Sequence, residues 1–336
     1  MTPIQWGIIG CGDVTEVKSG PALAKAHGSA LAMVMRRTAS LAADYARRHG
    51  VPRWTVDAAE LIHHPSVDAV YIATPPDSHR HYVELAAAAG KPILVEKPMA
   101  TRANDAAAMV DVCRQGGVPL FVAYYRRALP RFLAVKTLLD SGRLGAIRLV
   151  TVRHTQPPPP LGFDTHGPPW RLRPEVGGGG LFCDMGSHTL DLLDFLLGPI
   201  QSATGLARNQ GGLYPAEDTV TAHLEFANGL EALCAWCYVV HRPLDRITLM
   251  GDRGELSFAC FDTSPLEVTD GQGHHAIEAP NPPHVHQPLI QTVVDQLRGR
   301  GRCPSDGASA LRTEVVMETL LGAWRQRAAA TDPARR

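Results

Sequence analysis

The sequence predicts an α/β protein with an N-terminal, doubly wound parallel sheet and a second α/β domain built on an open, mainly antiparallel sheet. The first 120 residues alternate short apolar strands with helical patterns. The first strand runs into a tight turn, Gly10-Cys11-Gly12. After residue 125 strand-like segments follow one another with turns between them. At 336 residues the chain is longer than the usual domain with a single hydrophobic core, so we expect two domains, residues 1–124 and 125–336.

Repeated strand–helix units make up the first domain. Helices are expected to end at glycine, as at Gly90 and Gly116. The predicted strands are Gln5–Ile9, Ala30–Met35, Ala69–Ala73, Pro92–Val95 and Pro119–Ala123, and the predicted helices are Gly20–Ala26, Ala39–His49, His79–Ala89 and Ala103–Gly116.

The second domain has a different pattern. A predicted helix, Leu129–Ser141, and strand, Ala146–His154, precede a Pro/Gly-rich loop, Thr155–Gly180, in which we expect no regular structure. Turns such as Asn228-Gly229 then favour antiparallel pairing. The remaining predictions are helix Asp184–Leu197, strands Thr219–Phe226, Leu230–Val240, Asp245–Met250 and Gly254–Phe258, and helices near Gln287–Arg298 and Gly307–Arg325 on one face of the sheet.

The glycine turn is the strongest signal for a ligand. Gly10 permits the turn, and Gly12 lets the backbone approach a pyrophosphate at the start of the next helix. Such turns also join strands to helices where nothing binds, but a preceding strand, a following helix and a place near the chain start favour a dinucleotide. The third glycine position holds Thr15, so we expect slightly looser helix–strand packing there.

The end of the second strand bears on the choice of dinucleotide. An acidic residue usually binds the ribose hydroxyls at this place, but the chain has Arg36 and Arg37. Two guanidinium groups would attract the additional phosphate of NADP. If instead they simply point to solvent, NAD or dual use remains open.

Charged residues at later strand ends suggest catalysis. Thr74-Pro75 and His79 follow the fourth strand, whose carboxyl end should line the cofactor crevice. Glu96-Lys97-Pro98 directly follows the fifth buried strand. A surface salt bridge is the alternative interpretation, but the position at a strand end favours function.

A third cluster follows the run of glycines at 177–180. Asp184 and His188 are four residues apart, so a helix would place them on one face, and Asp191 could also orient the imidazole. A carboxylate beside imidazole suits general acid–base work near neutral pH. A helix-capping aspartate with a satisfied histidine is the alternative.

The chain resembles the Gfo/Idh/MocA family, which is named after glucose–fructose oxidoreductase, inositol dehydrogenase and a rhizopine-catabolism protein. The resemblance lies in three motifs and their order: the glycine turn, then Glu96-Lys97-Pro98, then the glycine run leading to Asp184, His188 and Asp191. The resemblance spans nearly the whole chain. It implies a Rossmann domain followed by an α/β domain whose open sheet often mediates dimers or tetramers.

The resemblance also implies roles for individual residues. Lys97 would touch the nicotinamide ribose and the reacting oxygen, and His188, paired with Asp184, would be the acid–base residue; these three form the catalytic set. The cofactor would be contacted by Gly10, Gly12, Asp13, Val14, Arg36, Arg37, Thr74, Pro75, His79, Glu96 and Lys97. The substrate would be contacted by Tyr124, Arg127, Trp170, Arg171, Asp184 and His188, with Trp170-Arg171 similar to a pair found in anhydrofructose-reductase-like members.

The function predicted on these grounds is an NADP-preferring oxidoreductase that interconverts a hydroxyl and a carbonyl on a sugar, cyclitol or related polyhydroxy compound. Two alternatives stay open. One is a glycoside-cleaving enzyme with tightly held NAD, which would retain its cofactor through purification and turn over without net reduction. The other is a non-enzymatic dinucleotide sensor, against which the presence of Lys97 and His188 argues.

Composition narrows the partners. Lys plus Arg equals Asp plus Glu at 33 each, so the chain lacks the excess of positive charge that nucleic-acid-binding proteins carry, and we expect no nucleic-acid partner. We expect no membrane association and a cytoplasmic protein, since no signal peptide or long apolar span is evident. Seven scattered cysteines predict structural thiols and no metal. Cys234 and Cys237 have the spacing of half a zinc site, which leaves metal or redox chemistry as the alternative, but no second pair of ligands is evident. An apolar sheet face with Leu230, Leu233, Ala235, Cys237 and Val239 predicts a homodimer or homotetramer. The alternative is that the terminal helices of the chain cover this face.

Overall fold

A computed structural model describes residues 2–159 and 168–331, and the chain divides into two compact units. Unit 1 comprises residues 1–129 and 281–311, and unit 2 comprises residues 130–280 and 312–336. The division expected from the sequence assigned everything after residue 124 to one domain, whereas residues 281–311 group with unit 1. The physical reason is the helix α10 (Gln287–Leu297), whose Leu289, Ile290, Val293 and Val294 share a core cluster with Trp6 and Ile8 of the first strand.

Unit 1 is built on one six-stranded parallel sheet in the order β3-β2-β1-β4-β5-β6. This is the doubly wound arrangement that the sequence predicts. Strands are added on one side of β1 up to β3 and on the other side from β4 onward, so the strand order reverses between β1 and β4. The carboxyl ends of those two strands therefore flank the crevice where open sheets bind ligands. The strands are β1 (Ile4–Ile9), β2 (Ser29–Met35), β3 (Arg53–Thr55), β4 (Ala69–Ile72), β5 (Ile93–Val95) and β6 (Leu120–Val122).

Helices cover both faces of this sheet, as the near-continuous apolar strands require. Consecutive residues of β4, such as Val70 and Tyr71, enter two different core clusters on the two faces. The helices are α1 (Asp13–Val17), α2 (Ser19–Lys25), α3 (Ala39–His49), α4 (Ala58–His63), α5 (His79–Ala88), α6 (Ala103–Gln115) and α10, with 3-10 turns η1 (Pro76–Ser78) and η2 (Tyr125–Ala128).

Unit 2 is built on an eight-stranded sheet in the order β14-β13-β12-β11-β7-β10-β9-β8. Only the β10–β7 pair is parallel among the strand pairs of the described residues in this sheet, so the sheet is mainly antiparallel, as expected. The strands are β7 (Ile147–Thr155), β8 (Ile200–Arg208), β9 (Thr219–Phe226), β10 (Glu231–Cys237), β11 (Leu244–Gly251), β12 (Gly254–Phe258), β13 (Leu266–Asp270) and β14 (Gly273–Ile277).

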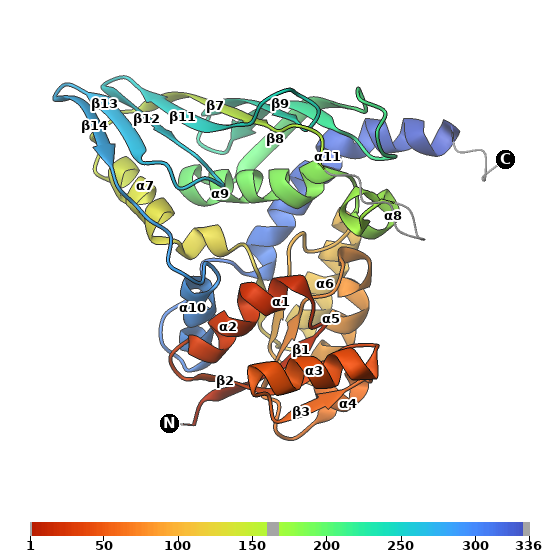
Figure 1. Ribbon diagram of the computed structural model, residues 1–336. Helices are drawn as coiled ribbons and strands as arrows, with labels where there is room; N and C mark the ends of the chain where they lie inside the picture. Colours follow the sequence, from red (N-terminus) through yellow and green to blue (C-terminus); the bar gives the residue numbers. More distant parts are fainter. Residues whose placement is uncertain (1, 160–167, 332–336) are drawn as a thin grey trace. The chain divides into compact units, whose positions relative to one another are not determined.

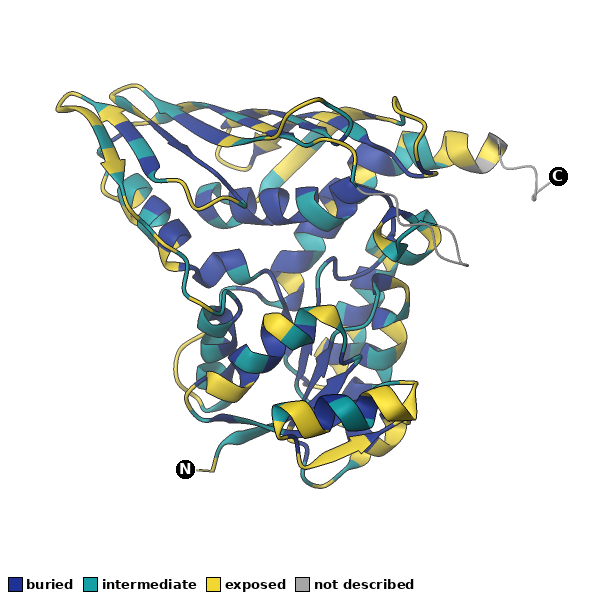
Figure 2. Cartoon of the chain, viewed as in Figure 1, coloured by how far each residue is buried: buried dark blue, intermediate teal, exposed yellow. Residues whose placement is uncertain are grey.

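Helices lie along one face of the unit 2 sheet (Figure 1). They are α7 (Pro130–Asp140), α9 (Ser187–Leu197) and the part of α11 (Gly307–Thr331) beyond residue 311. Along β9, buried Val220, Leu224 and Phe226 alternate with exposed Thr221 and Glu225 (Figure 2). The side chains of β9 on the face away from the helices are therefore exposed in a single copy of the chain.

The loop expected over 155–180 departs from that expectation. Strand β7 continues through Thr155, and a 3-10 turn η3 (Trp170–Leu172) and a short helix α8 (Pro174–Gly177) follow later. Pro174 is tolerated because it occupies the first turn of α8, where no intrahelical partner for its missing N–H is needed. Residues 160–167 lie outside the described part of the chain. Within the described residues no helix is both long and apolar enough to cross a membrane.

Candidate active site

The glycine turn has the geometry that a dinucleotide needs. Gly10 has φ +90°, and a Cβ there would lie 2.7 Å from Thr74 Cγ2 and 3.0 Å from the Thr74 amide nitrogen, so only glycine fits. A Cβ built at Gly12 would meet no described atom within 4 Å. Gly12 caps α1, whose first turn holds Asp13 and Val14. The turn is thus open on the side where a pyrophosphate would approach the helix start.

Thr15 takes part in the turn itself, and the looser helix–strand packing expected there stays a prediction. Its buried hydroxyl donates a hydrogen bond to the Gly12 carbonyl at 2.7 Å, and the Tyr45 hydroxyl donates to the Thr15 carbonyl at 2.9 Å. The close approach occurs instead at Gly20, where a Cβ would lie 2.2 Å from the Thr15 oxygen. Glycine is therefore required five residues later than the usual pattern places it.

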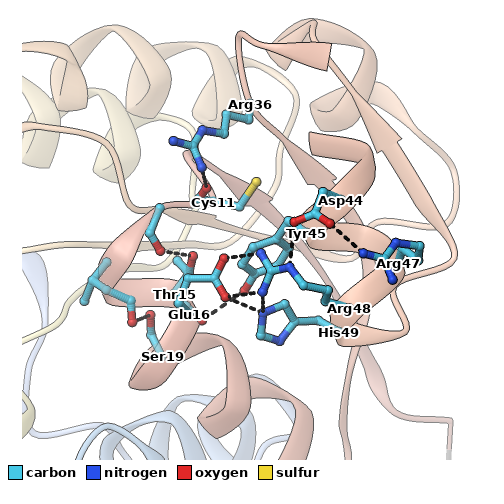
Figure 3. A network of polar contacts seen from close by, with 12 residues as sticks. Cys11, Thr15, Glu16, Ser19, Arg36, Asp44, Tyr45, Arg47, Arg48 and His49 are labelled. Carbon is cyan, nitrogen blue, oxygen red and sulfur yellow. Dashed lines mark hydrogen bonds and ion pairs between the residues drawn. The ribbon is translucent and has the colours of Figure 1, made fainter. Parts of the chain in front are cut away.

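A charged network fixes the same helix from outside (Figure 3). Arg48 of α3 donates to both carboxylate oxygens of Glu16 at 2.5 and 2.8 Å and to Asp44 at 2.6 Å, and His49 Nε2 lies 2.7 Å from Glu16. These contacts lower the pKa of Glu16 to about 2, the Arg48 hydrogen bonds contributing most. The network ties α1 to α3.

Arg36 reaches over the glycine turn. Its Nη1 donates to the Cys11 carbonyl at 3.1 Å (Figure 3), whereas Arg37 is exposed. The guanidinium is thereby held at the end of β2, where dinucleotide-binding folds recognise the ribose. Burial raises the pKa of the Cys11 thiol to about 11 against the opposing charge of Arg36, so this thiol is protonated at neutral pH.

Thr74 and Pro75 line the end of β4 and are partly exposed, but His79 is not. The His79 ring is fully buried, with Nε2 2.8 Å from the Thr74 carbonyl oxygen and Nδ1 3.2 Å from the Met99 carbonyl oxygen. Burial lowers its pKa. The side chain thus ties the end of β4 to the segment after Lys97-Pro98, and its contact with the cofactor stays a prediction.

Glu96 and Lys97, which follow β5, differ in burial: Glu96 is buried and Lys97 is partly exposed. The Glu96 carboxyl is buried, accepts a hydrogen bond from the Tyr71 hydroxyl, and lies 3.4 Å from Nε2 of His286, an ion-pair distance. Burial raises its pKa, but His286, Tyr71 and the charge of Lys97 outweigh burial and lower it. The Lys97 amide donates to the same carboxylate at 3.3 Å. Glu96 therefore anchors the backbone from which the partly exposed Lys97 extends.

Two residues expected to face a substrate are buried within unit 1. Tyr124 is fully buried in a core cluster, and Arg127, 3% exposed, donates from Nη1 to the Pro304 carbonyl at 3.3 Å. Both help to build the end of β6 and the turn η2. Their contact with a substrate stays a prediction.

In unit 2, Asp184, Trp170 and Arg171 come together. Arg171 Nε lies 3.3 Å from Asp184 Oδ2, and its guanidinium covers the Trp170 ring at 4.4 Å. The sequence separation of these residues gave no indication of this contact. It joins η3 to the segment that follows the glycine run.

The helix expected over 184–197 begins irregularly. Residues Phe182–Gly186 form a π-helical turn, η4, and regular α9 starts only at Ser187. Asp184 and His188 therefore belong to different helical types, and the four-residue spacing does not place them on one regular α-helical face. His188 is 5% exposed and meets Phe261 edge-on at 6.0 Å, while Asp191 is buried. Single-turn π-bulges occur often at functional sites.

Sequence reasoning missed several groups around this segment. His154 of β7 stacks on Phe261 at 4.7 Å, and the buried Glu217 carboxyl accepts from the Gly180 amide at 2.8 Å. Burial raises the pKa of the Tyr238 hydroxyl well above its ordinary value, and the nearby charges of Asp184 and Glu217 add to the rise. Glu217-Asp218 directly precedes β9, whose alternate residues are buried, so this charged pair lies at the opposite end of a strand from Glu96-Lys97 and the search of strand ends for function passed over it.

The cysteines form no converging pair in β10. Cys234 is buried on the helix-covered face with Trp236, while Cys237 is partly exposed on the other, because residues three apart on a strand point to opposite faces. Across residues 2–159 and 168–331 there is no group of three or more His, Cys, Asp or Glu side chains that could hold a metal ion.

Comparison with known proteins identifies the relatives of this chain. Residues 4–124 match the model of an oxidoreductase family with an NAD-binding Rossmann fold, and residues 132–257 match the GFO/IDH/MocA C-terminal domain. Oxidoreductase P35 from Formosa agariphila is 35% identical over 319 residues, covering 95% of this chain and 98% of that protein. The chain belongs to the Gfo/Idh/MocA family.

Other relatives of this Gfo/Idh/MocA oxidoreductase agree with the fold. A 1,5-anhydro-D-fructose reductase from Ensifer adhaerens is 28% identical over 304 residues, covering 83% of this chain and 90% of that protein. A solved structure of an aldose–aldose oxidoreductase from Caulobacter crescentus, complexed with glycerol, matches with a TM-score of 0.84 at 26% identity, covering 96% of this chain and 98% of that one. The predicted family and fold class are confirmed.

Proposed function

We propose that this oxidoreductase interconverts a hydroxyl and a carbonyl on a sugar, cyclitol or related polyhydroxy compound and prefers NADP. The observation that supports the reaction best is the presence of both Lys97, held at a strand end by buried Glu96, and the buried His188 in a chain whose relatives are named sugar oxidoreductases. The Arg171–Asp184 pair beside the Trp170 ring supports a polyhydroxy substrate, since paired polar groups next to an aromatic face suit sugars.

The residues present fit a dinucleotide. Gly10 and Gly12 would hold the pyrophosphate, Arg36 would meet the phosphate on the adenosine ribose, and Thr74 and Pro75 would lie near the nicotinamide. Bound NADP would supply the acceptor for the hydride that leaves the carbon. In the oxidising direction His188 accepts the hydroxyl proton and Lys97 donates a hydrogen bond to the reacting oxygen, as the family pattern assigns.

The reaction is tested on purified protein with a panel of sugars, cyclitols and their keto forms, each with NADPH/NADP and NADH/NAD. On the substrate found, Lys97→Ala and His188→Ala should each lower turnover by about 10²–10⁴-fold with the fold retained. The exposed His274→Ala is the matched control and should be neutral. Near-normal turnover in both catalytic variants would refute the assignment.

Cofactor preference is tested separately by fluorescence titration. We expect NADPH to bind more tightly than NADH, and the double variant R36A/R37A to abolish most of that difference, about 1–3 kcal/mol for each charge-assisted hydrogen bond removed. Arg114→Ala, an exposed arginine of α6, should change neither affinity. Equal affinities in the unmodified protein would show that Arg36 and Arg37 do not select NADP.

Self-association is the remaining part of the proposal. The uncovered face of the unit 2 sheet exposes Leu206 and Leu233 by more than half, with partly exposed Ala235, Cys237 and Val239 beside Leu233 along the chain. Leu230, which the sequence assigned to this face, is instead buried. We propose that this face joins copies of the chain into a homodimer or homotetramer.

A further inference from the structure

The glycine run before Asp184 passes directly over one buried carboxyl group, that of Glu217. A Cβ at Gly180 would lie 2.2 Å from the Glu217 carbonyl oxygen, and one at Gly179 would lie 2.9 Å from Glu217 Oε1 and 2.6 Å from Cys183 Sγ. Gly178 has φ +84° and ends α8. Gly180 is therefore required by the close approach of the segment that precedes β9, and Gly178 by its left-handed backbone conformation.

Hydrogen bonds hold the run at both ends. The Gly180 amide donates to Glu217 Oε1 at 2.8 Å, and Arg325 of α11 donates from Nη2 to the Gly178 carbonyl at 2.6 Å. Arg325 is itself paired with Glu318 at 2.6 Å. Shortly after Gly180 the π-helical turn begins, with Asp184 in it and His188 in the first turn of α9 after it.

The Glu217 carboxyl lies in a mixed electrostatic environment. It is 1% exposed, and the charged and titratable groups that face it are Arg325, Asp218, Tyr214, Tyr238 and Cys183. Burial raises its pKa to about 7, against the Gly180 amide and the charge of Arg325. The proposed reaction gives this carboxyl no chemical step.

We propose that Glu217 is a positioning residue that acts through the Gly180 amide to fix the π-helical turn carrying Asp184 and the start of α9 carrying His188. An ionised acceptor binds an amide more strongly than a neutral one, so the turn is held firmly when Glu217 is charged and more loosely when it is protonated. This inference rests on the proposed function of Asp184 and His188. It adds to that function a residue that touches neither substrate nor cofactor.

The test is Glu217→Gln, which keeps an oxygen for the Gly180 amide and removes the charge. At pH 8 we expect kcat to fall by about 10–100-fold, the loss typical of misplaced catalytic groups. The ratio of wild-type to variant kcat should decline toward one below pH 6, where Glu217 is protonated in the unmodified enzyme. Cofactor affinity, a property of unit 1, should not change. Glu225→Gln, an exposed glutamate on β9, is the matched control.

A second measurement needs no variant. In the unmodified protein, hydrogen exchange at Gly180, corrected for its intrinsic rate, should lose protection as the pH falls through about 7. A pH-independent kcat ratio near one, or constant Gly180 protection, would overturn the inference while Lys97→Ala and His188→Ala remain inactive. If those two variants keep their turnover, it is the proposed function that fails.

Discussion

The buried Glu217 carboxyl predicts that one isosteric substitution stabilises the protein in a pH-dependent way. The pKa of this group rises from an ordinary 4.5 to about 7 on folding. At about 1.4 kcal/mol per pH unit, the preference of the folded state for the proton corresponds to about 3 kcal/mol. Because the folded pKa is raised, the penalty is absent below about pH 4.5, grows as the pH rises, and is complete above about pH 7.

Glu217→Gln removes that titration. The free energy of unfolding of the variant minus that of the wild type should therefore increase by about 2–3 kcal/mol between pH 5 and pH 8. Urea denaturation at several pH values measures it, and the difference between the two proteins cancels the other titrating groups. Any cost of burying the new amide is the same at every pH. Glu225→Gln should show no such trend. A difference that stays constant or falls with pH would mean that Arg325 and the Gly180 amide outweigh burial, and the reasoning above would be wrong.

Three further outcomes are expected. Glu16→Gln should destabilise unit 1 at neutral pH. The loss of stability should vanish as the pH falls from about 4.5 toward 2, because a carboxyl group with a lowered pKa stabilises the folded state only above that range. Thermal melts at pH 7 and pH 3 measure this loss, and equal losses at both pH values would exclude the ion pair with Arg48 as the cause. Light scattering at micromolar concentration should give a dimer or tetramer mass that Leu233→Glu reduces, whereas a monomeric mass for the unmodified chain would refute the sheet interface. Asp184→Asn should lower kcat less than His188→Ala does if Asp184 orients rather than transfers protons, and an equal loss would assign it a direct role.

Much of unit 1 was predictable from the sequence because its signals are local. Five buried strands with short apolar runs and helices ended by glycine are visible in the chain itself, as is the Gly10-Cys11-Gly12 turn. The edge strand β3 was missed because it has three residues, two of them exposed. Helix α4 was missed because six residues span less than two turns and give weak periodicity.

The candidate site was predictable in its members and much less so in its geometry. Strand ends marked Arg36 and Lys97, yet the Arg36 contact with the Cys11 carbonyl joins two strands and requires the fold. The spacing of Asp184 and His188 predicted a regular helix, whereas Asp184 lies in a π-helical turn. That turn follows the glycine run, which packs closely on Glu217, a residue distant in the sequence. Contacts between distant segments, such as that of Arg171 with Asp184, leave no pattern in a single sequence.

Because residues 281–311 belong to unit 1, this unit cannot complete its core until late in synthesis of the chain. A ribosome releases β1 through β6 first, but α10, which supplies Leu289, Ile290, Val293 and Val294 to the core around Trp6 and Ile8, follows some 165 residues after β6. The nascent nucleotide-binding unit therefore waits with apolar surface exposed while the whole sheet of unit 2 is synthesised. Domains usually fold as units during synthesis, N-terminal first. Here the first unit to emerge cannot be the first to finish, and a fragment ending at residue 129 is expected to bind chaperones or aggregate rather than fold alone.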